Sequence, residues 1–226
     1  MAYKVEDSLF RKEENMNLPT KITASRIAAT IILIIALFVL SLINFTTPLL
    51  GDTRINLVFL IVFIFFLIAS YTDHLDGYLA RKNNQVTNLG KFLDPVADKL
   101  LINSMLIFLT APMIFAPYAK EQTALIPVWC VIIMVFRDTV VDALRFIAAQ
   151  KGVVIAANIF GKMKTVLQMV AISAVLLNDF PFHYMYPNNE NPYLTVTAFL
   201  VYLATLVSLL SGIIYVWQNR KVLKEN

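Results

Sequence analysis

Long apolar stretches separated by short polar segments follow one another along the whole chain. A helix needs about 20 residues to cross a hydrocarbon core about 30 Å thick. Six stretches of this order lie near residues 22–43, 55–75, 91–111, 124–146, 158–177 and 193–217. The segment from Ile55 to Ser70 is continuously apolar, whereas the strands of a membrane barrel alternate apolar and polar residues. The pattern therefore predicts an all-α integral membrane protein with six transmembrane helices.

Basic residues between these stretches predict the orientation of the chain in the membrane. Only Arg54 and Lys120 fall in the loops on one side. Sixteen of the 19 lysines and arginines fall on the other side, at residues 1–26, 81–99, 145–164 and 220–226. Cytoplasmic loops are enriched in Lys and Arg, so both termini are expected in the cytoplasm. The outer loops, of which residues 180–192 form the longest, are expected to be plain connectors.

The remaining composition agrees with a membrane protein. With 58% hydrophobic and 15% charged residues, the chain is neither a soluble globule nor disordered. One cysteine, Cys130, excludes a disulfide framework and a zinc site with paired cysteines. The net charge of +4 is explained by the cytoplasmic loops, so no nucleic-acid partner is expected. Residues 1–15 are expected to form a polar N-terminal extension without the apolar core of a signal peptide, and residues 16–226 a single membrane domain.

Four aspartates cluster where the second stretch reaches its cytoplasmic end. At about 100° per residue, positions spaced by three, four or seven residues share one face of a helix. The turn near residues 82–88 is short, so the two helices are expected to be antiparallel neighbours whose carboxylates face one another. The residues that share a face are Asp73, Asp76, Gly77 and Ala80 before the turn, and Gly90, Asp94 and Asp98 after it.

These carboxylates predict a metal site. Clustered carboxylates at partial burial repel one another, and a divalent cation with hard oxygen ligands removes this repulsion. Ionisable residues at membrane depth are also costly and are usually functional. We therefore expect one or two Mg²⁺ or Mn²⁺ ions at the four aspartates. Gly77, Ala80 and Gly90 leave space on the same face, either for a ligand or for a close helix crossing.

The eight positions from Asp73 to Asp98, with Arg81 among them, resemble the complete motif of the CDP-alcohol phosphotransferase family. The resemblance implies a six-helix homodimer with a two-metal site, which transfers a phosphoryl-linked group from a CDP-activated lipid to an alcohol and releases CMP. It further implies that Asp73, Asp76 and Asp94 bind metal, while Asp98 completes the second metal site and acts as the general base. The residues that it implies for binding the CDP-lipid are Asn17, Thr20, Arg26, Asp76, Gly77, Ala80, Arg81 and Gly90.

A second group of charged residues lies in the fourth and fifth stretches. The fifth begins with two lysines near a helix N-terminus, where backbone N–H groups favour an anion. The fourth carries two arginines and two aspartates within an arc of about 140°. Together they either bind a phosphate or form an ion-paired network, and both can hold. These residues are Arg137, Asp138, Asp142 and Arg145 in the fourth stretch, and Lys162 and Lys164 in the fifth.

Within the family, the sequence resembles the bacterial members that use glycerol-3-phosphate as the acceptor. This resemblance implies that Arg137, Arg145, Lys162 and Lys164 hold the acceptor phosphate. Asp138 departs from the pattern, because a glutamate is expected at this position. The expected activity is a step of phospholipid biosynthesis on the cytoplasmic side of the cell membrane. It transfers a phosphatidyl group from CDP-diacylglycerol to glycerol-3-phosphate and gives phosphatidylglycerophosphate and CMP.

Three other activities stay open. Cardiolipin synthases and inositol-phosphate transferases of the same family differ in the acceptor alone. A cation-coupled transporter belongs to a different class, whose sites lie near the membrane midplane on interrupted helices within repeated halves. The aspartates are expected at one membrane interface, and the chain shows no internal repeat. These two features favour an enzyme over a transporter.

Overall fold

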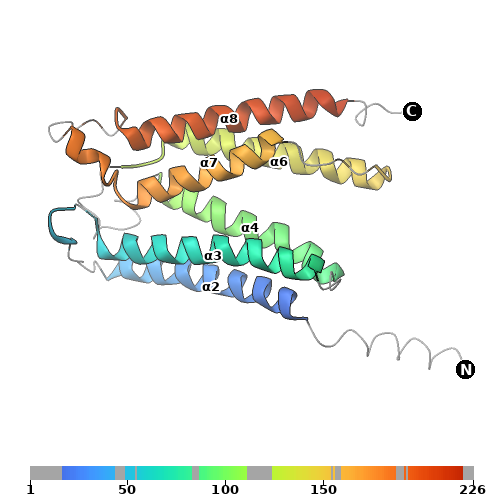
Figure 1. Ribbon diagram of the computed structural model, residues 1–226, viewed down its shortest axis with the longest axis horizontal. Helices are drawn as coiled ribbons and strands as arrows, with labels where there is room; N and C mark the ends of the chain where they lie inside the picture. Colours follow the sequence, from blue (N-terminus) through green and yellow to red (C-terminus); the bar gives the residue numbers. More distant parts are fainter. Residues whose placement is uncertain are drawn as a thin grey trace, which may run out of the picture. The chain divides into compact units, whose positions relative to one another are not determined.

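The computed structural model describes a helical protein. The residues that it describes are 17–43, 49–53, 55–82, 87–110, 124–153, 155, 159–186, 191 and 193–220, without the side chains of 52, 74, 76, 78–81, 88 and 91. The predicted extension over residues 1–15 lies outside these ranges. The α-helices of the described part, shown in Figure 1, are α2 (Leu18–Leu42), α3 (Leu57–Lys82), α4 (Asn88–Phe108), α6 (Val128–Gln150), α7 (Ile159–Leu176) and α8 (Val196–Gln218).

Each of the six predicted stretches corresponds to one of these helices, and the all-α prediction is confirmed for the described residues. Their only β pairing is an isolated bridge between Leu49 and Asn56, and two short 3₁₀ helices span Gly51–Thr53 and Phe182–Met185. The largest difference in length concerns α3, which continues to Lys82, well past the predicted end at residue 75. The acidic motif therefore lies on helices on both sides of the turn.

Three of the described helices, α2, α7 and α8, are long and apolar enough to cross a membrane. In α3 the apolar part is shorter and spans Leu57–Asp73. The helices α4 and α6 are less apolar than these, because they carry charged residues of the two predicted sites. Large apolar side chains such as Ile32, Phe136 and Trp217 are more than half exposed, as expected for surfaces that contact lipid.

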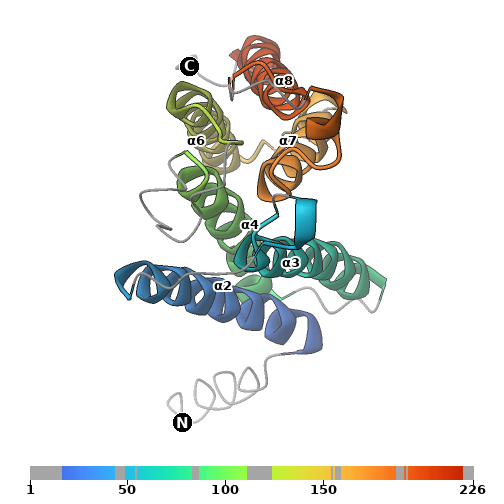
Figure 2. The same ribbon diagram turned by 90° about the vertical axis from the view of Figure 1, so that its left-hand side faces the viewer.

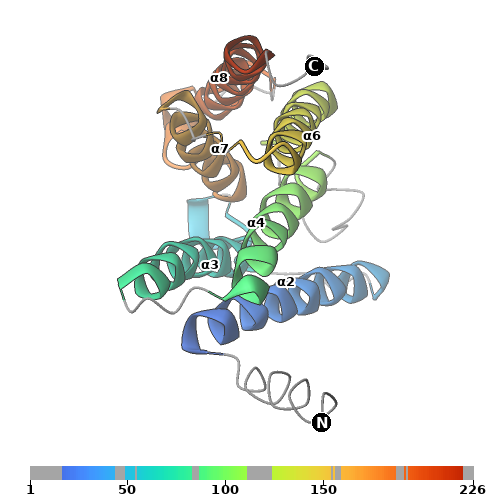
Figure 3. The ribbon, with the colours of Figure 1, turned by 90° about the vertical axis from the view of Figure 1, so that its right-hand side faces the viewer.

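The chain divides into two compact units. The first consists of Met1–Ala36 and Ile64–Ile102, and it contains the start of α2, the end of α3 and the start of α4. The second consists of Leu37–Phe63 and Asn103–Asn226, and it contains α6, α7 and α8. In the second unit α8 packs against both α6 and α7, and Figures 2 and 3 show these two helices on opposite sides of α8.

Small residues on α8 allow this packing. Ala204, Ser208, Ser211 and Gly212 follow one another at spacings of four, three and one, and all four are buried. Lipid tails are as apolar as leucine side chains, so helices in a bilayer associate through close van der Waals contact and hydrogen bonds. A face of small residues permits that close contact. It also leaves room between the helices for long polar side chains from α6 and α7.

The loop before α8 is more than the plain connector that the sequence predicts. Asp179 accepts the backbone N–H of Thr197 at 2.9 Å, and Tyr186 Oη accepts the N–H of Val196 at 3.0 Å. Tyr186 also donates its hydroxyl hydrogen to Asp179. The pKa of Tyr186 is raised mainly by partial burial and, to a smaller extent, by this hydrogen bond. The two side chains thus satisfy N–H groups at the helix start that have no partner within the helix.

Candidate active site

Polar residues recur every third position at the start of α2. Thr20, Thr23 and Arg26 are at most 5% exposed, although most of the helix is apolar. The hydroxyl oxygen of Thr23 lies 3.2 Å from the carbonyl oxygen of Pro19, so the hydroxyl has a polar neighbour in the core. The spacing of three keeps these side chains within a narrow arc of the helix. This polar face makes contacts with both helices that carry the predicted metal ligands.

Arg26 binds the first of the predicted ligands. Its Nη1 donates to Asp73 Oδ1 at 2.5 Å, and the side chain of Arg26 is 4% exposed whereas that of Asp73 is 38% exposed. Arg26 Nε and Nη2 are buried and have no hydrogen-bond partner among the described residues. Unused donors of a buried guanidinium are costly, and they suit an anionic ligand with several oxygen atoms. The structure thus brings together Arg26, a predicted ligand of the CDP-lipid, and Asp73, a predicted metal ligand.

The second helix of the acidic motif is held by the same face of α2. Thr23 donates its hydroxyl hydrogen to Asp94 Oδ1 at 3.0 Å, and Asp98 follows one turn later on α4. Asp94 and Asp98 are both partly exposed, which leaves their carboxylates accessible to a ligand. Sequence reasoning missed Thr23. Its place three residues after Thr20 and three before Arg26 could have indicated it.

The donors at this site fit a hard divalent cation, because carboxylate oxygens are the ligands that Mg²⁺ and Mn²⁺ prefer. Among the side chains that the structure describes, no group of three or more His, Cys, Asp or Glu residues could hold a metal ion. The side chain of Asp76 is not among them, nor are those of Ala80 and Arg81. Gly77 is described and lies partly buried on α3, one turn after Asp73.

The start of α2 lies close to the start of α4 (Figure 3), and a chain of hydrogen bonds joins them. Asn17 Oδ1 accepts the hydroxyl of Thr20 at 2.7 Å, and the hydroxyls of Thr20 and Thr87 lie 2.9 Å apart. Thr87 in turn accepts the backbone N–H of Gly90 at 2.9 Å. The structure therefore brings together three of the predicted nucleotide-binding residues, Asn17, Thr20 and Gly90. Thr87, which was not predicted, connects them as the cap of α4, a role that its position just before the helix indicates.

Gly90 is required for this close approach. A Cβ atom at Gly90 would lie 3.0 Å from Thr87 Oγ1 and 3.2 Å from Thr20 Oγ1. Such distances are shorter than ordinary van der Waals contact, so any other residue would push the two threonines apart. Gly90 of the acidic motif thus has a packing role. The same lack of a side chain leaves backbone accessible to a ligand.

In the second unit, a buried carboxylate of α6 is shared by two cations. Lys164 Nζ lies 2.9 and 2.7 Å from the two oxygens of Asp138, and Arg137 Nη1 lies 3.0 Å from Asp138 Oδ1. The side chains of all three residues are at most 10% exposed. The ion-paired network that the sequence left open is therefore present. Two cations thus lie close together in the buried part of this unit, held by one shared carboxylate.

The other two predicted phosphate ligands lie apart from this buried group. Arg145 Nε donates to the hydroxyl of Tyr215 at 3.0 Å, and its guanidinium lies 5.3 Å from the centre of the Tyr215 ring. Tyr215 is buried, whereas Arg145 is exposed. Lys162 is also exposed, whereas Lys164 is buried and belongs to the group around Asp138. Arg145 is thus oriented by α8 with its charged end accessible.

Residues of α8 fix the position of Arg137. Its Nη2 donates to Ser211 Oγ at 2.5 Å, and its Nε is buried without a partner among the described residues. Gln168, one turn after Lys164 on α7, and Ser208 on α8 also have buried polar atoms without a partner in the described part of the chain. Buried polar atoms of this kind are usually bonded to water or to a ligand. Gln168 and Ser208 were not predicted, although a glutamine in an apolar helix was visible in the sequence.

Gly212 is expected to be intolerant of any side chain because of Arg137. A Cβ atom there would lie 2.6 Å from Arg137 Cγ, which is close to the backbone and cannot swing away easily. Gly212→Ala should therefore displace Arg137 from Ser211 and Asp138, at a cost of about 1–3 kcal/mol in unfolding free energy. Denaturation of the purified variants would measure this. In the Arg137→Ala background the same substitution should cost far less, and an equal cost in both backgrounds would contradict the clash.

Comparisons with known proteins agree with the motif. Residues 16–217 match the family described as CDP-alcohol phosphatidyltransferase. The chain is similar to the CDP-diacylglycerol–glycerol-3-phosphate 3-phosphatidyltransferase of Bacillus subtilis (strain 168), with 45% identity over 166 residues, 74% of this chain and 79% of that protein. A protein of the same name from Mycoplasma pneumoniae is 40% identical over 71% of this chain and 67% of its own length. One from Haemophilus influenzae is 35% identical over 74% of this chain and 81% of its own length. The chain therefore belongs to the CDP-alcohol phosphatidyltransferase family.

Proposed function

We propose that this chain transfers a phosphatidyl group from CDP-diacylglycerol to glycerol-3-phosphate and releases CMP. The names of its relatives support this activity. The observation that carries the choice of acceptor is the buried group of Arg137, Asp138 and Lys164, in which two cations share one carboxylate. Two buried cations held close together suit a phosphorylated acceptor, whereas choline or ethanolamine would need acidic or aromatic partners.

In the proposed reaction, a hydroxyl oxygen of the acceptor forms a bond to the phosphorus that carries the diacylglycerol. The bond between that phosphorus and the oxygen of the CMP phosphate breaks, and Asp98 takes the proton of the attacking hydroxyl. One or two Mg²⁺ or Mn²⁺ ions, bound by Asp73, Asp76, Asp94 and Asp98, would neutralise the diphosphate and the leaving CMP. The two unused donors of Arg26 support a diphosphate beside Asp73.

Binding of the cytidine diphosphate is assigned to residues of the first unit. The support is the hydrogen-bonded group around Thr87 and the close packing at Gly90. Arg137, Arg145, Lys162 and Lys164 of the second unit are assigned to the acceptor phosphate. The residues proposed to bind the CDP-lipid are Asn17, Thr20, Arg26, Asp76, Gly77, Ala80, Arg81 and Gly90.

We further propose that all six described helices cross the cell membrane, with both termini and the active site on the cytoplasmic side. The helices contain 18 to 26 residues, and about 20 are needed to cross a bilayer. The distribution of basic residues supports the orientation. A homodimer is part of the same proposal and rests on the resemblance to the family.

Acceptor-dependent release of CMP tests the reaction directly. Purified protein would be given CDP-diacylglycerol and Mg²⁺ or Mn²⁺, with glycerol-3-phosphate, phosphatidylglycerol, inositol phosphate or serine as the acceptor. We expect release with glycerol-3-phosphate and none when the metal is chelated. Release with phosphatidylglycerol or inositol phosphate alone would overturn the acceptor and keep the family chemistry. No release with any acceptor would overturn the proposed reaction.

Arg145→Ala should weaken acceptor binding more than it lowers turnover. A hydrogen bond to a charged group is worth about 1.5–3 kcal/mol, so the KM for glycerol-3-phosphate should rise about 10- to 100-fold. Tyr215→Phe removes only the hydroxyl that accepts the hydrogen bond from Arg145 Nε, and it should raise this KM much less. The KM for CDP-diacylglycerol should stay unchanged in both variants. An unchanged KM for glycerol-3-phosphate in Arg145→Ala would remove Arg145 from the acceptor site.

A further inference from the structure

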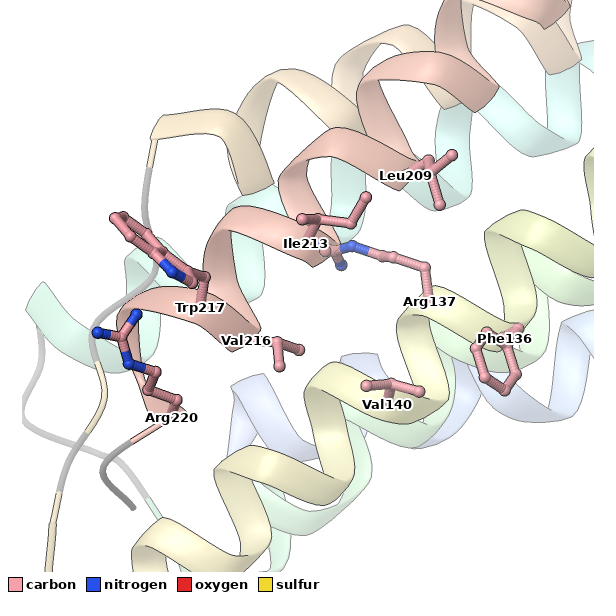
Figure 4. Close-up of a pocket in the computed structure, with 9 residues that line it drawn as sticks. Phe136, Arg137, Val140, Leu209, Ile213, Val216, Trp217 and Arg220 are labelled. Atoms are coloured by element: carbon pink, nitrogen blue, oxygen red, sulfur yellow. The ribbon is translucent and has the colours of Figure 1, made fainter. Parts of the chain in front are cut away.

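A groove of about 420 Å³ lies between α6 and α8 in the second unit. Figure 4 shows the side chains of the two helices that face one another across it. Most of them are aliphatic or aromatic, and the charged ones are Arg137 from α6 and Arg220, just after the end of α8. The lining residues are Phe136, Arg137, Val140, Leu209, Gly212, Ile213, Val216, Trp217 and Arg220.

The middle of the groove is apolar in spite of Arg137. Two nitrogens of its guanidinium are bonded to Ser211 and Asp138, so the aliphatic part of the side chain lies between α6 and α8 (Figure 4). Ile213 and Leu209, on the same side of α8, are both at least 40% exposed. This surface is too apolar to bind the acceptor phosphate, and its exposed apolar residues suit a hydrocarbon chain.

The length of the groove matches one leaflet of a bilayer. From Leu209 to Arg220 the chain advances 11 residues, about 16 Å at 1.5 Å per residue. The hydrocarbon core is about 30 Å thick, so one leaflet contributes about half of that. The helix ends at Gln218, so Arg220 lies where the chain leaves the apolar region. A lipid acyl chain in the groove would therefore have its headgroup near Arg220.

Two residues at this end have the chemistry of a headgroup site. The guanidinium of Arg220 lies 5.1 Å from the centre of the Trp217 ring, and both side chains are exposed. Tryptophan is enriched at membrane interfaces, where its ring lies at the level of the headgroups. An arginine stacked on an aromatic ring is oriented while its N–H groups stay available to a phosphate.

We propose that this groove binds an anionic phospholipid of the surrounding membrane, with one acyl chain between α6 and α8 and the phosphate on Arg220. Zwitterionic lipids bind there less well, because their headgroups carry no net negative charge to attract Arg220. The groove shares the aliphatic part of Arg137 with the proposed acceptor site, but binding of the lipid does not depend on the reaction. It depends only on the position of α6 and α8 in the membrane.

Quenching of Trp217 fluorescence by brominated lipids tests the proposal. In the Trp129→Phe background, Trp217 is the only tryptophan of the chain. The protein would be reconstituted into vesicles of dibrominated phosphatidylserine mixed with phosphatidylcholine, and of dibrominated phosphatidylcholine mixed with phosphatidylserine. We expect phosphatidylserine to be preferred about fivefold at the groove. Arg220→Gln should abolish the preference, whereas Lys151→Gln, a basic residue at the end of α6, should retain it.

A second variant tests the acyl-chain position. Ile213→Phe fills the groove at an exposed position and should lower the preference, whereas Ile132→Phe, which is exposed on α6 outside the groove, should not. Equal quenching by both lipids in the parent protein would overturn the proposal. Weak quenching by both lipids would also overturn it, and would indicate that a second copy of the chain covers the groove. CMP release plays no part in this measurement, so a failed reaction and a failed lipid site are distinguishable.

Discussion

Asp98→Asn is expected to abolish turnover while the protein still folds and binds CDP-diacylglycerol. Asparagine keeps the size of the side chain, but its amide cannot take the proton of the attacking hydroxyl. General-base catalysis contributes about 10²–10⁴-fold, so CMP release should fall by at least this factor. Loss of one charged metal ligand would add to the effect. Asp98 is partly exposed in the middle of α4, so the substitution leaves no cavity in the core.

The comparison with Asp94→Asn separates the two roles of these aspartates. Asp94 accepts a hydrogen bond from Thr23 and is proposed only as a metal ligand. In Asp94→Asn a higher concentration of Mg²⁺ or Mn²⁺ should restore part of the turnover, whereas in Asp98→Asn it should not. Binding of the CDP-lipid, measured by equilibrium dialysis of a labelled analogue, serves as the control for folding. Full turnover in Asp98→Asn would refute its assignment as the general base.

The helices and the acidic motif could be predicted because both depend on local periodicity. The apolar stretches are about as long as a bilayer requires, and the spacings of three and four residues put the aspartates on one helix face. The structure confirms helices at all six positions within its described residues. It differs at the end of α3, which reaches Lys82. Polar and charged residues after Asp73 end the apolar stretch there but do not end the helix.

The contacts that hold the charged groups could not be predicted, because they join residues far apart in the sequence. Ser211 and Tyr215 on α8 orient Arg137 and Arg145 on α6, about 70 residues earlier. Neither residue belongs to a motif that the sequence analysis recognised. In α7, by contrast, the spacing could have separated the two lysines that the sequence analysis grouped together. Lys162 and Lys164 are two residues apart and therefore about 200° apart on a helix, so only one of them faces the core.

Asp138 could be recognised as a charged residue from the sequence, whereas its two partners could be identified only in the structure. Asp138→Ala is expected to destabilise the protein strongly, because Arg137 and Lys164 would stay buried without their shared counter-ion. Removing one partner of a buried ion pair costs about 3–5 kcal/mol. The free energy of unfolding in mixed micelles, measured by the loss of helical circular dichroism, would report this loss.

The matched control is Asp138→Glu, which keeps the charge and restores the residue that the family pattern predicts. It should retain most of the stability, because a carboxylate one methylene longer can still accept hydrogen bonds from Lys164 Nζ and Arg137 Nη1. Its KM for glycerol-3-phosphate would then show whether the position of these cations, and not only their charge, matters for the acceptor. If Asp138→Ala were as stable as Asp138→Glu, the two cations would not need the carboxylate. The two buried cations would then be held by other contacts, and the choice of a phosphorylated acceptor would lose the structural support that rests on their pairing with Asp138.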